Sequence, residues 1–415
     1  MIPVKIGEFA AQFNVTRDTV RFYITNGLLI PDDQGAQYNF TQRECQDMET
    51  ILRMKEQQFS LKEIREYLSI LRVSTMVEPE SIQGVIDLLD HKKAELDRQA
   101  DQLRAISESI DGDIQTLLTQ DSPQRKRSGV PLRALSLLAC PYCGKALELK
   151  RASLNSRYVY SGILHCGCGY QISIENGIVK TGNLYTAPYD KPDLKRGLYR
   201  NVSDEFIVFL QRCNDFALRE MKQTDLTGKV VMEGHCNGYF FLYNHLKELS
   251  GDCIYIIQDK YLEMVEMYKR NIERLGLELD ILYLADASTH FPLRAQCVDL
   301  LLDFMGDNEH SLYFKSFYMD DIKQYLSADA RVIGASMGFR TGAKSLDALR
   351  IKYPEGDWDG YCKDKWDELY TRAGFRRESF PVGVLLDSYD QYSFECHQQG
   401  EEYFFEYFSA VRRKS

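Results

Sequence analysis

The stretch from Val15 to Leu29, "VTRDTVRFYITNGLL", decides the fold of the first part of the chain. Thr16 stands where a helix N-cap is expected, Val20 continues the apolar spacing of a buried helix face, and Asn26-Gly27 is a helix stop signal. The residues just before this stretch predict another helix, with a turn at Asn14-Val15 and an apolar face made of Ile6, Phe9, Ala10 and Phe13. Two short helices joined in this way predict a helix-turn-helix.

The segment after this stretch, "PDDQGAQYNFTQREC", predicts a two-stranded wing with turn residues at Asp32, Asp33 and Gly35. "ILRMKEQQFSLKEIREYL" then predicts two more helices. In a helix-turn-helix the second helix presents its N-terminal, outward side chains to the major groove of DNA. Here those side chains are Thr16, Arg17, Thr19 and Arg21. The alternative interpretation is a generic small helical domain.

"TRDTVRFYITNGLLIP", followed by a short wing and "FSLKEIREYL", resembles the mercury-resistance (MerR) family of transcription regulators over roughly the first quarter of the chain. The resemblance implies a winged helix-turn-helix over residues 1–75. It also implies DNA contacts from Arg17, Thr19, Arg21 and Tyr23, and a backbone contact from Tyr38 in the wing. The chain departs from the family at Ile24, where an acidic residue is usual, and in the wing, where "AQYNF" has no arginine.

Residues 76–120 predict a long dimerisation helix. Apolar residues recur there at every seventh position, at Ile82, Leu89, Leu96, Leu103, Ile110 and Leu117. A coiled coil needs such a seam, which Ile86 and Ile114 widen. We place the solvated faces at Lys92, Lys93, Glu95, Asp97 and Arg98. The alternative is a lone helix lying on the C-terminal part of its own chain. The family resemblance favours the coiled coil and implies a homodimer that reads a palindromic site.

A linker is predicted over 121–135, where "TQDSPQRKRSGVP" ends the heptads. The segment 136–182 follows with two close pairs of cysteines, Cys140, Cys143, Cys166 and Cys168. Four sulfurs at this spacing suit tetrahedral structural zinc, with Gly144 and Gly169 completing two tight turns of a zinc ribbon. His165 is an alternative nitrogen ligand, and a redox pair or unbound thiols are the alternative interpretation. The ribbon resembles those that precede some ribosomal-RNA and small-molecule methyltransferases.

Residues 195–415 alternate strands and helices, as in a doubly wound α/β sheet. Three apolar strands end at Glu233, at Asp259 and at Asp286-Ala287, and a fourth is predicted over Val298 to Leu302. Ligands of such sheets bind at the carboxyl ends of the strands where the strand order reverses. We therefore expect Glu233, Asp259 and Asp286 to converge on one crevice.

These strand ends, with "FPL", "VDLLLD", "AGFRRESF" and "EEYFFEYFSAVRRK", resemble the class I S-adenosylmethionine-dependent methyltransferase fold over about the last half of the chain. The resemblance implies that the turn Gly234 to Gly238 approaches the methionine part of the ligand and that Asp259 binds the ribose hydroxyls. It also implies that Asp286 and Ala287 approach the adenine. The predicted cofactor-binding residues are Glu233, Gly234, Cys236, Gly238, Asp259, Asp286 and Ala287.

The glycine turn departs from the methyltransferase pattern, because it is one residue shorter and Cys236 stands where the middle glycine is expected. A side chain at that position crowds a ligand that needs close backbone approach. A dinucleotide-binding Rossmann domain is the nearest rival, but the G-x-G-x-x-G fingerprint is absent. No catalytic residue is assigned, and His235 is interpreted as a structural side chain rather than a base.

The whole chain has 415 residues, a formal charge of −10 and eleven cysteines. The charge argues against a globally basic nucleic-acid coat, and no apolar run reaches membrane-spanning length. The opening residues do not form a leader, and the cysteine pattern indicates reduced thiols plus a metal site rather than a disulfide framework. We therefore expect a multidomain cytoplasmic protein without a membrane partner.

Two functions remain. The first is a dimeric regulator that binds double-stranded promoter DNA and acts on RNA polymerase there, while its methyltransferase-like domain senses a small-molecule effector such as S-adenosylmethionine or a drug-like compound. The second is an active S-adenosylmethionine-dependent methyltransferase that modifies RNA or a small molecule and carries a regulatory DNA-binding head. The first is preferred for two reasons. Cys236 departs from the glycine pattern, and the end of the fourth strand, Asp303-Phe304-Met305-Gly306, lacks the Asn/Asp-Pro-Pro-Tyr/Phe motif with which some methyltransferases hold a target nitrogen, so catalysis is without support.

Overall fold

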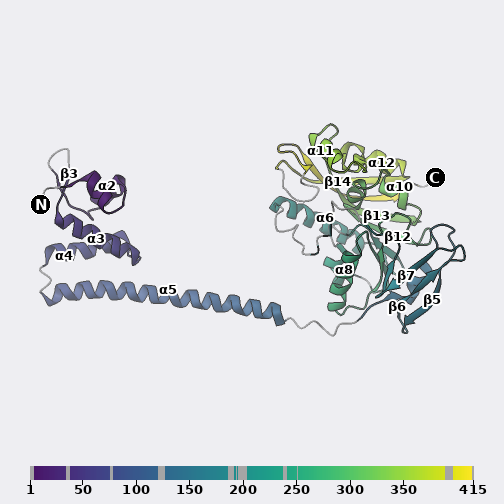
Figure 1. Cartoon of the computed structure of the whole chain (residues 1–415), viewed down its shortest axis with the longest axis horizontal. Coiled ribbons are helices and arrows are strands. Elements are labelled where there is room, and N and C mark those ends of the chain that lie inside the picture. Colours follow the sequence, from purple (N-terminus) through teal and green to yellow (C-terminus); the bar gives the residue numbers. More distant parts are fainter. Residues whose placement is uncertain are drawn as a thin grey trace. The chain divides into compact units, whose positions relative to one another are not determined.

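The computed structural model describes residues 4–33, 38–74, 78–119, 127–185, 191–192, 194, 203–236, 241–249, 251–387 and 396–413. The chain divides into two compact units, Met1–Asp121 and Ser122–Ser415, and Figure 1 labels many of their elements. Among the described residues, no helix is both long and apolar enough to cross a membrane.

The first unit begins with the predicted helix-turn-helix. Helix α1 (Ile6–Gln12) and helix α2 (Arg17–Thr25) are joined by a turn in which Asn14 has a φ of 51°. The Thr16 side chain accepts a hydrogen bond from the backbone N–H of Thr19, as an N-cap does. Val20 is fully buried. The predicted fold of this segment is confirmed.

The wing is present, but its strands begin earlier than expected. Strand β2 (Asp32–Asp33) pairs with β3 (Tyr38–Phe40), and β1 (Val4–Lys5) pairs with the other edge of β3. The turn predicted at Asp32 and Asp33 is therefore wrong, because both residues pair across the wing. Gly35 lies outside the described residues. The ring of Phe40 stacks on that of Phe9, with centroids 4.1 Å apart, so the wing shares the core of the helices.

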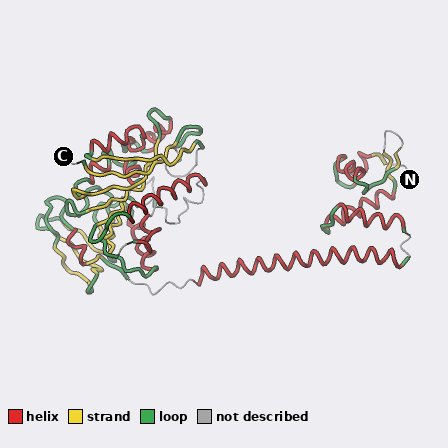
Figure 2. The backbone as a smooth tube through the Cα atoms, turned by 180° about the vertical axis from the view of Figure 1, so that it is seen from behind, coloured by secondary structure: helices red, strands yellow, loops and turns green. Residues whose placement is uncertain are grey.

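Helices α3 (Gln42–Glu56) and α4 (Leu61–Val73) complete the globular part of this unit. Each begins with a capping box, Thr41 with Glu44 and Ser60 with Glu63, which satisfies the first free N–H groups of the helix. Helix α5 (Pro79–Thr119) then runs for 41 residues, close to the bounds that the heptads predict. Figure 2 shows it as one unbroken helix.

The apolar seam of α5 faces solvent within the described chain. Its exposed members are Ile82, Ile86, Leu89, Leu103, Ile106, Ile110 and Ile114. Leu96 is half-buried, and the side chain of Leu117 lies outside the description. Lys92 was expected on a solvated face, and this expectation is wrong. Its ammonium is buried between α4 and α5, where it pairs with Glu63 at 3.4 Å and Glu95 at 2.8 Å.

The second unit is built on one twelve-stranded sheet in the order β14-β15-β13-β12-β9-β10-β11-β8-β7-β6-β4, with β5 paired to β6. Its α/β strands are β9 (Val230–Glu233), β10 (Ile254–Asp259), β11 (Asp280–Ala285), β12 (Val298–Phe304), β13 (Leu326–Gly338), β14 (Phe375–Leu385) and β15 (Tyr403–Arg412). The pairs β11-β10, β10-β9, β9-β12 and β12-β13 are parallel. Strand β15 is antiparallel to both of its neighbours, β13 and β14. The chain moves from β9 outward to β11 and then returns to β12 on the other side of β9, so the strand order reverses between β9 and β12.

Helices cover both faces of this sheet, as Figure 2 shows. They are α6 (Asp204–Lys222), α7 (Phe241–His245), α8 (Leu262–Arg274), α9 (Gly306–Ser311), α10 (Tyr318–Ile322), α11 (Lys344–Lys352) and α12 (Trp366–Arg372). Alternate residues of β10 enter different cores: Tyr255 and Ile257 pack with α6 and α8, whereas Ile256 packs with α10 and α12. This is a doubly wound, Rossmann-like fold, as the strand and helix pattern predicts.

The ribbon strands continue the same sheet. They are β4 (Val130–Pro131), β5 (Glu148–Leu154), β6 (Tyr158–His165), β7 (Gln171–Glu175) and β8 (Ile178–Lys180), with the 3₁₀ turn η1 (Leu132–Leu137) between β4 and β5. Strand β8 pairs in parallel with β11, with Ile178 opposite Tyr283. Residues predicted to form a linker at 121–135 include β4, which pairs with β6. The ribbon is thus an extension of the α/β sheet.

Candidate functional site

The N-terminal end of α2 presents polar side chains outward. Thr16 and Arg17 are exposed, and Thr19 is half-buried because its backbone and hydroxyl both bond to the capping hydroxyl of Thr16. Arg21 is exposed and pairs with Asp18 at 3.0 Å. An exposed pair of this kind is weak and breaks readily when a phosphate or base edge competes. The arrangement suits insertion of the start of α2 into a DNA groove.

The two aromatic residues of α2 differ in burial, although their ring centroids lie only 6.0 Å apart. Tyr23, which was expected to contact DNA, is only 2% exposed and lies in the core of the unit, whereas Phe22 is 49% exposed. Burial of Tyr23 is the opposite of what a DNA contact predicts, and it follows from its position three residues after Val20 on the same helix face. Tyr38, on the wing, is half-buried.

The four predicted cysteines form one cluster. Their Sγ atoms all lie within 4.8 Å of one another, with Cys140 and Cys168 at 3.5 Å and Cys143 and Cys166 at 3.4 Å. A tetrahedral zinc ion with bonds of about 2.3 Å requires sulfurs about 3.8 Å apart. The cluster therefore fits such an ion. His165 belongs to no metal-ligating group found among the described residues.

Two tight turns carry the cysteines. Gly144 has a φ of 69° and donates its N–H to Cys140 O, and Gly169 has a φ of 97° and donates to Cys166 O. Positive φ at these positions favours glycine. The backbone N–H of Tyr170 is the main cause that lowers the pKa of Cys168 to about 7, which favours the thiolate that a metal binds.

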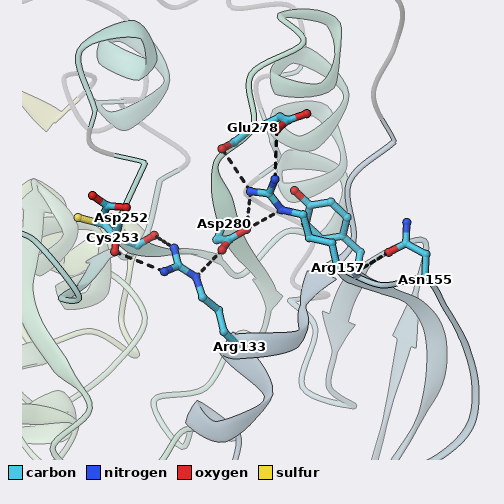
Figure 3. Close-up of polar contacts among 8 residues, drawn as sticks. Arg133, Asn155, Arg157, Asp252, Cys253, Glu278 and Asp280 are labelled. Carbon is cyan, nitrogen blue, oxygen red and sulfur yellow. Dashed lines mark hydrogen bonds and ion pairs between the residues drawn. The ribbon is translucent and has the colours of Figure 1, made fainter.

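A polar clamp ties the ribbon to the α/β strands, as Figure 3 shows. Arg157, just before β6, bonds the Asp280 carboxylate at 3.0 and 3.2 Å and pairs with Glu278 at 3.3 Å. Arg133, in η1, pairs with the other Asp280 oxygen and donates to the Cys253 carbonyl. Asp280 is thus held from both sides at the first residue of β11. Sequence reasoning missed this clamp, because its partners are more than a hundred positions apart.

The three predicted acids lie at the carboxyl ends of neighbouring strands. Glu233 ends β9 and accepts hydrogen bonds from the backbone N–H groups of Phe241 and Leu242 at 2.9 and 3.1 Å, so it caps α7. Asp259 ends β10 and accepts from Tyr261 N at 2.8 Å. Asp286 follows β11, and its N–H donates to Asp259 O at 3.0 Å. They adjoin the reversal between β9 and β12, where ligands of doubly wound sheets bind.

Burial changes the charge at these strand ends. Removal from water raises the pKa of Glu233 to about 8, that of Asp259 to about 7 and that of Asp303, near the end of β12, to about 6. Burial also raises the pKa of Asp286. These strand ends therefore carry less negative charge at neutral pH than their four carboxyl groups indicate.

The glycine turn contains strained and unpartnered groups. Cys236 is buried, and Gly238 lies outside the described residues. His235 has a φ of 50°, and neither of its buried ring nitrogens has a hydrogen-bond partner in the described part of the chain. Desolvation lowers the pKa of His235, so the ring is neutral. Its ring lies 4.9 Å from that of Tyr318 and 5.8 Å from that of His310, two residues that sequence reasoning also missed.

Two family models match residues of the first unit. Residues 4–70 match the MerR HTH family regulatory protein model, and residues 45–112 match the MerR DNA-binding model. No curated protein matches the chain. One similar structure is HiNmlR, a MerR family regulator lacking the sensor domain, bound to promoter DNA, with 18% identity over 28% of this chain and 91% of that one (TM-score 0.22). The first unit therefore carries a MerR-type DNA-binding domain.

Methyltransferases are among the solved structures that the comparison of the rest of the chain finds. A SAM-dependent methyltransferase from Aquifex aeolicus shares 16% identity over 54% of this chain and 100% of that one (TM-score 0.34). Phosphoethanolamine N-methyltransferase 2 of Haemonchus contortus, in complex with S-adenosyl-L-methionine, shares 12% identity over 48% of this chain (TM-score 0.34). The match spans about half of the Haemonchus enzyme, 52% of its length.

Proposed function

We propose that this chain, whose first unit carries a MerR-type DNA-binding domain, is a dimeric transcription regulator whose second unit senses a small-molecule effector. The observation that carries the proposal is the exposure of Arg17 and Arg21 at the start of α2, on the same chain as a doubly wound sheet whose strand order reverses between β9 and β12. The partners are double-stranded promoter DNA and RNA polymerase at that promoter. With these partners, the proposed place of action is the cytoplasm.

Dimerisation through α5 follows from its exposed apolar seam, since seven large aliphatic side chains on one helix are costly to leave in water. A symmetric dimer places two copies of α2 on a palindromic site. The ligand then acts by changing the shape of the dimer and so the deformation of the bound promoter.

S-adenosylmethionine is the first candidate effector. The acid that ends β10, Asp259, stands where a ribose-binding carboxylate is expected in a doubly wound sheet. A structural zinc ion in the Cys140, Cys143, Cys166 and Cys168 cluster holds the ribbon, and its four protein ligands leave it no open position for chemistry.

The test of DNA binding is Arg17→Ala combined with Arg21→Ala, measured by fluorescence anisotropy on the DNA upstream of the gene. Loss of two contacts worth about 1 kcal/mol each weakens binding about 30-fold. The matched control is Arg98→Ala with Arg104→Ala, which removes the same charge from α5, where Arg104 pairs with Asp101 as Arg21 pairs with Asp18. Equal loss in the control, or no loss in the α2 variant, contradicts the assignment.

Effector sensing is tested by repeating the anisotropy titration of the wild-type protein with saturating S-adenosylmethionine. A change in DNA affinity or in transcript level in a purified transcription reaction supports sensing of this ligand. Binding of the ligand without either change contradicts it. Methylation of added RNA or small molecules by the same preparation favours the enzyme function instead.

A further inference from the structure

Residues 181–185, here called the strap, cross the carboxyl ends of β11 and β10. The strap leaves β8, and Thr181 Oγ1 donates to Asp286 Oδ2 at 2.6 Å. The N–H of Ala287 donates to Asn183 O at 2.5 Å. At the far end of the strap, Tyr185 N donates to Lys260 O at 3.3 Å. The last ribbon strand thus continues as a bonded segment over the edge of the α/β sheet.

The strap forms hydrogen bonds with the groups that a bound nucleoside needs, the Asp286 carboxylate and the Ala287 N–H. Ligands of a doubly wound sheet lie outside the carboxyl ends of its strands, and the acid that ends the second strand holds the ribose. Asp286 and Ala287 are the positions that the sequence resemblance assigns to the base. One Asp286 oxygen accepts from Ser288 N and Oγ, and the other accepts from Thr181. A base at this edge therefore competes with the strap for the Asp286 carboxylate and the Ala287 N–H.

The far end of the strap is held by an aromatic cluster. The ring of Tyr185 lies edge-on to those of Tyr261 at 5.3 Å and Tyr313 at 5.1 Å. The ammonium of Lys260 lies 4.5 Å from the centre of the Tyr185 ring and pairs with Glu309 at 2.7 Å. Glu309 belongs to α9, which follows β12, so Lys260 links the end of the strap to the element that follows β12.

A second group occupies the glycine turn. A Cβ atom added to Gly234 would lie 2.3 Å from the hydroxyl oxygen of Tyr318, so this hydroxyl rests against the turn. The hydroxyl is fully buried and has no hydrogen-bond partner in the described part of the chain. A buried hydroxyl without a partner is costly. A polar group of a ligand that reached this hydroxyl would give it the hydrogen-bond partner that it lacks.

We propose that the strap is an internal occupant of the ligand crevice, which an adenosine-type ligand must displace in order to bind. The proposal rests on the proposed sensing function and adds how ligand entry is regulated. Because the strap continues β8, its displacement loosens the pairing of β8 with β11 next to it. Ligand binding is thereby coupled to the ribbon.

The test is Thr181→Val combined with Asn183→Ala in the full-length, zinc-loaded protein, with S-adenosylmethionine as the probe in isothermal titration calorimetry. The pair removes the Thr181 bond to Asp286 and the Asn183 bond to Ser288, while Asp286 keeps both donors of Ser288. We expect the variant to bind the probe about tenfold tighter than wild type. The matched control is Thr224→Val, whose hydroxyl bonds Arg331 and not the strap.

Unchanged or weaker affinity in a variant with a wild-type unfolding transition overturns the proposal, as does the absence of binding in both proteins. If the unfolding transition of the variant differs from that of wild type, hydrogen exchange of the wild-type protein is the test instead. There, faster exchange of the amides of residues 181–185 on addition of the probe supports displacement, and unchanged exchange at saturation overturns it.

The outcomes separate the strap from the sensing function. Tighter binding by the variant with no effect of the probe on DNA affinity supports the strap and contradicts sensing of S-adenosylmethionine. A wild-type protein whose DNA affinity responds to the probe, with a variant that binds no tighter, contradicts the strap alone.

Discussion

A carboxyl group shut away from water differs in charge from one on the surface, and the end of β10 shows the consequence. Asp259 is fully buried, and its pKa rises from 3.8 to about 7 because burial disfavours the charged form. Between these values the folded protein holds a proton that the unfolded chain releases. The free energy of unfolding therefore falls as the pH rises through this window, by about 4 kcal/mol for this group alone.

Asp259→Asn removes that titration while its Oδ1 still accepts from Tyr261 N. We expect the melting temperature of the second unit to fall less between about pH 5 and pH 7 in the variant than in wild type. Calorimetry at several pH values measures this, with the exposed Asp215→Asn as control. A variant with the wild-type pH dependence would show that another group titrates.

Single residues were predicted well where their position in an element decides their role. Apolar runs that stop at Glu233 and Asp259 located two strand ends correctly. The burial of Tyr23 was not predicted, although its spacing from Val20 was a usable signal for the inner face of α2. Burial of Lys92 was not visible in the sequence, because it depends on Glu63 of another helix.

At the scale of elements, α5 has an apolar seam and, in its C-terminal half, no described partner that covers it. Leu103 is 67% exposed and Ile110 is 53% exposed. Helix length and seam could be predicted from the heptads alone, since both follow from the 3.5-residue period. The identity of the partner could not, because the same seam fits a second copy or another surface.

Leu103→Asp with Ile110→Asp is expected to give a monomer that keeps its helical content, because two charges in an apolar seam are costly only when the seam is covered. Sedimentation velocity measures the mass, and circular dichroism measures the helix. Ala105→Asp, on the opposite face of α5, is the control and stays dimeric. A wild-type protein that is already monomeric contradicts dimerisation through this seam.

At the scale of the molecule, the features that the sequence did not predict depend on contacts between residues far apart in the chain. Alternating strands and helices predicted the α/β part, and the cysteine spacing predicted the four-sulfur cluster. The merger of ribbon and sheet depends on β8 meeting β11 and on Arg157 meeting Asp280, and no local pattern reports such contacts. The same holds for the strap.

Because the sheet is shared, disruption of the four-cysteine cluster is expected to affect the whole second unit. Cys140→Ser is expected to lower zinc below one ion per chain by elemental analysis and to lower the melting temperature of that unit in a single transition. Cys45→Ser, in the first unit, is the control. A second unit that melts as in wild type after zinc is lost would show that the ribbon folds independently of the sheet.

The pairing of β8 with β11 also sets an order of events during synthesis. Ile178 leaves the ribosome 105 residues before its partner Tyr283. At about 5–20 residues per second, the apolar residues of β8 wait about 5–20 s for the strand that covers them. During that interval the nascent ribbon presents an open strand edge, a target for chaperones and for mispairing with neighbouring chains. Slower translation between β8 and β11 would lengthen this exposure.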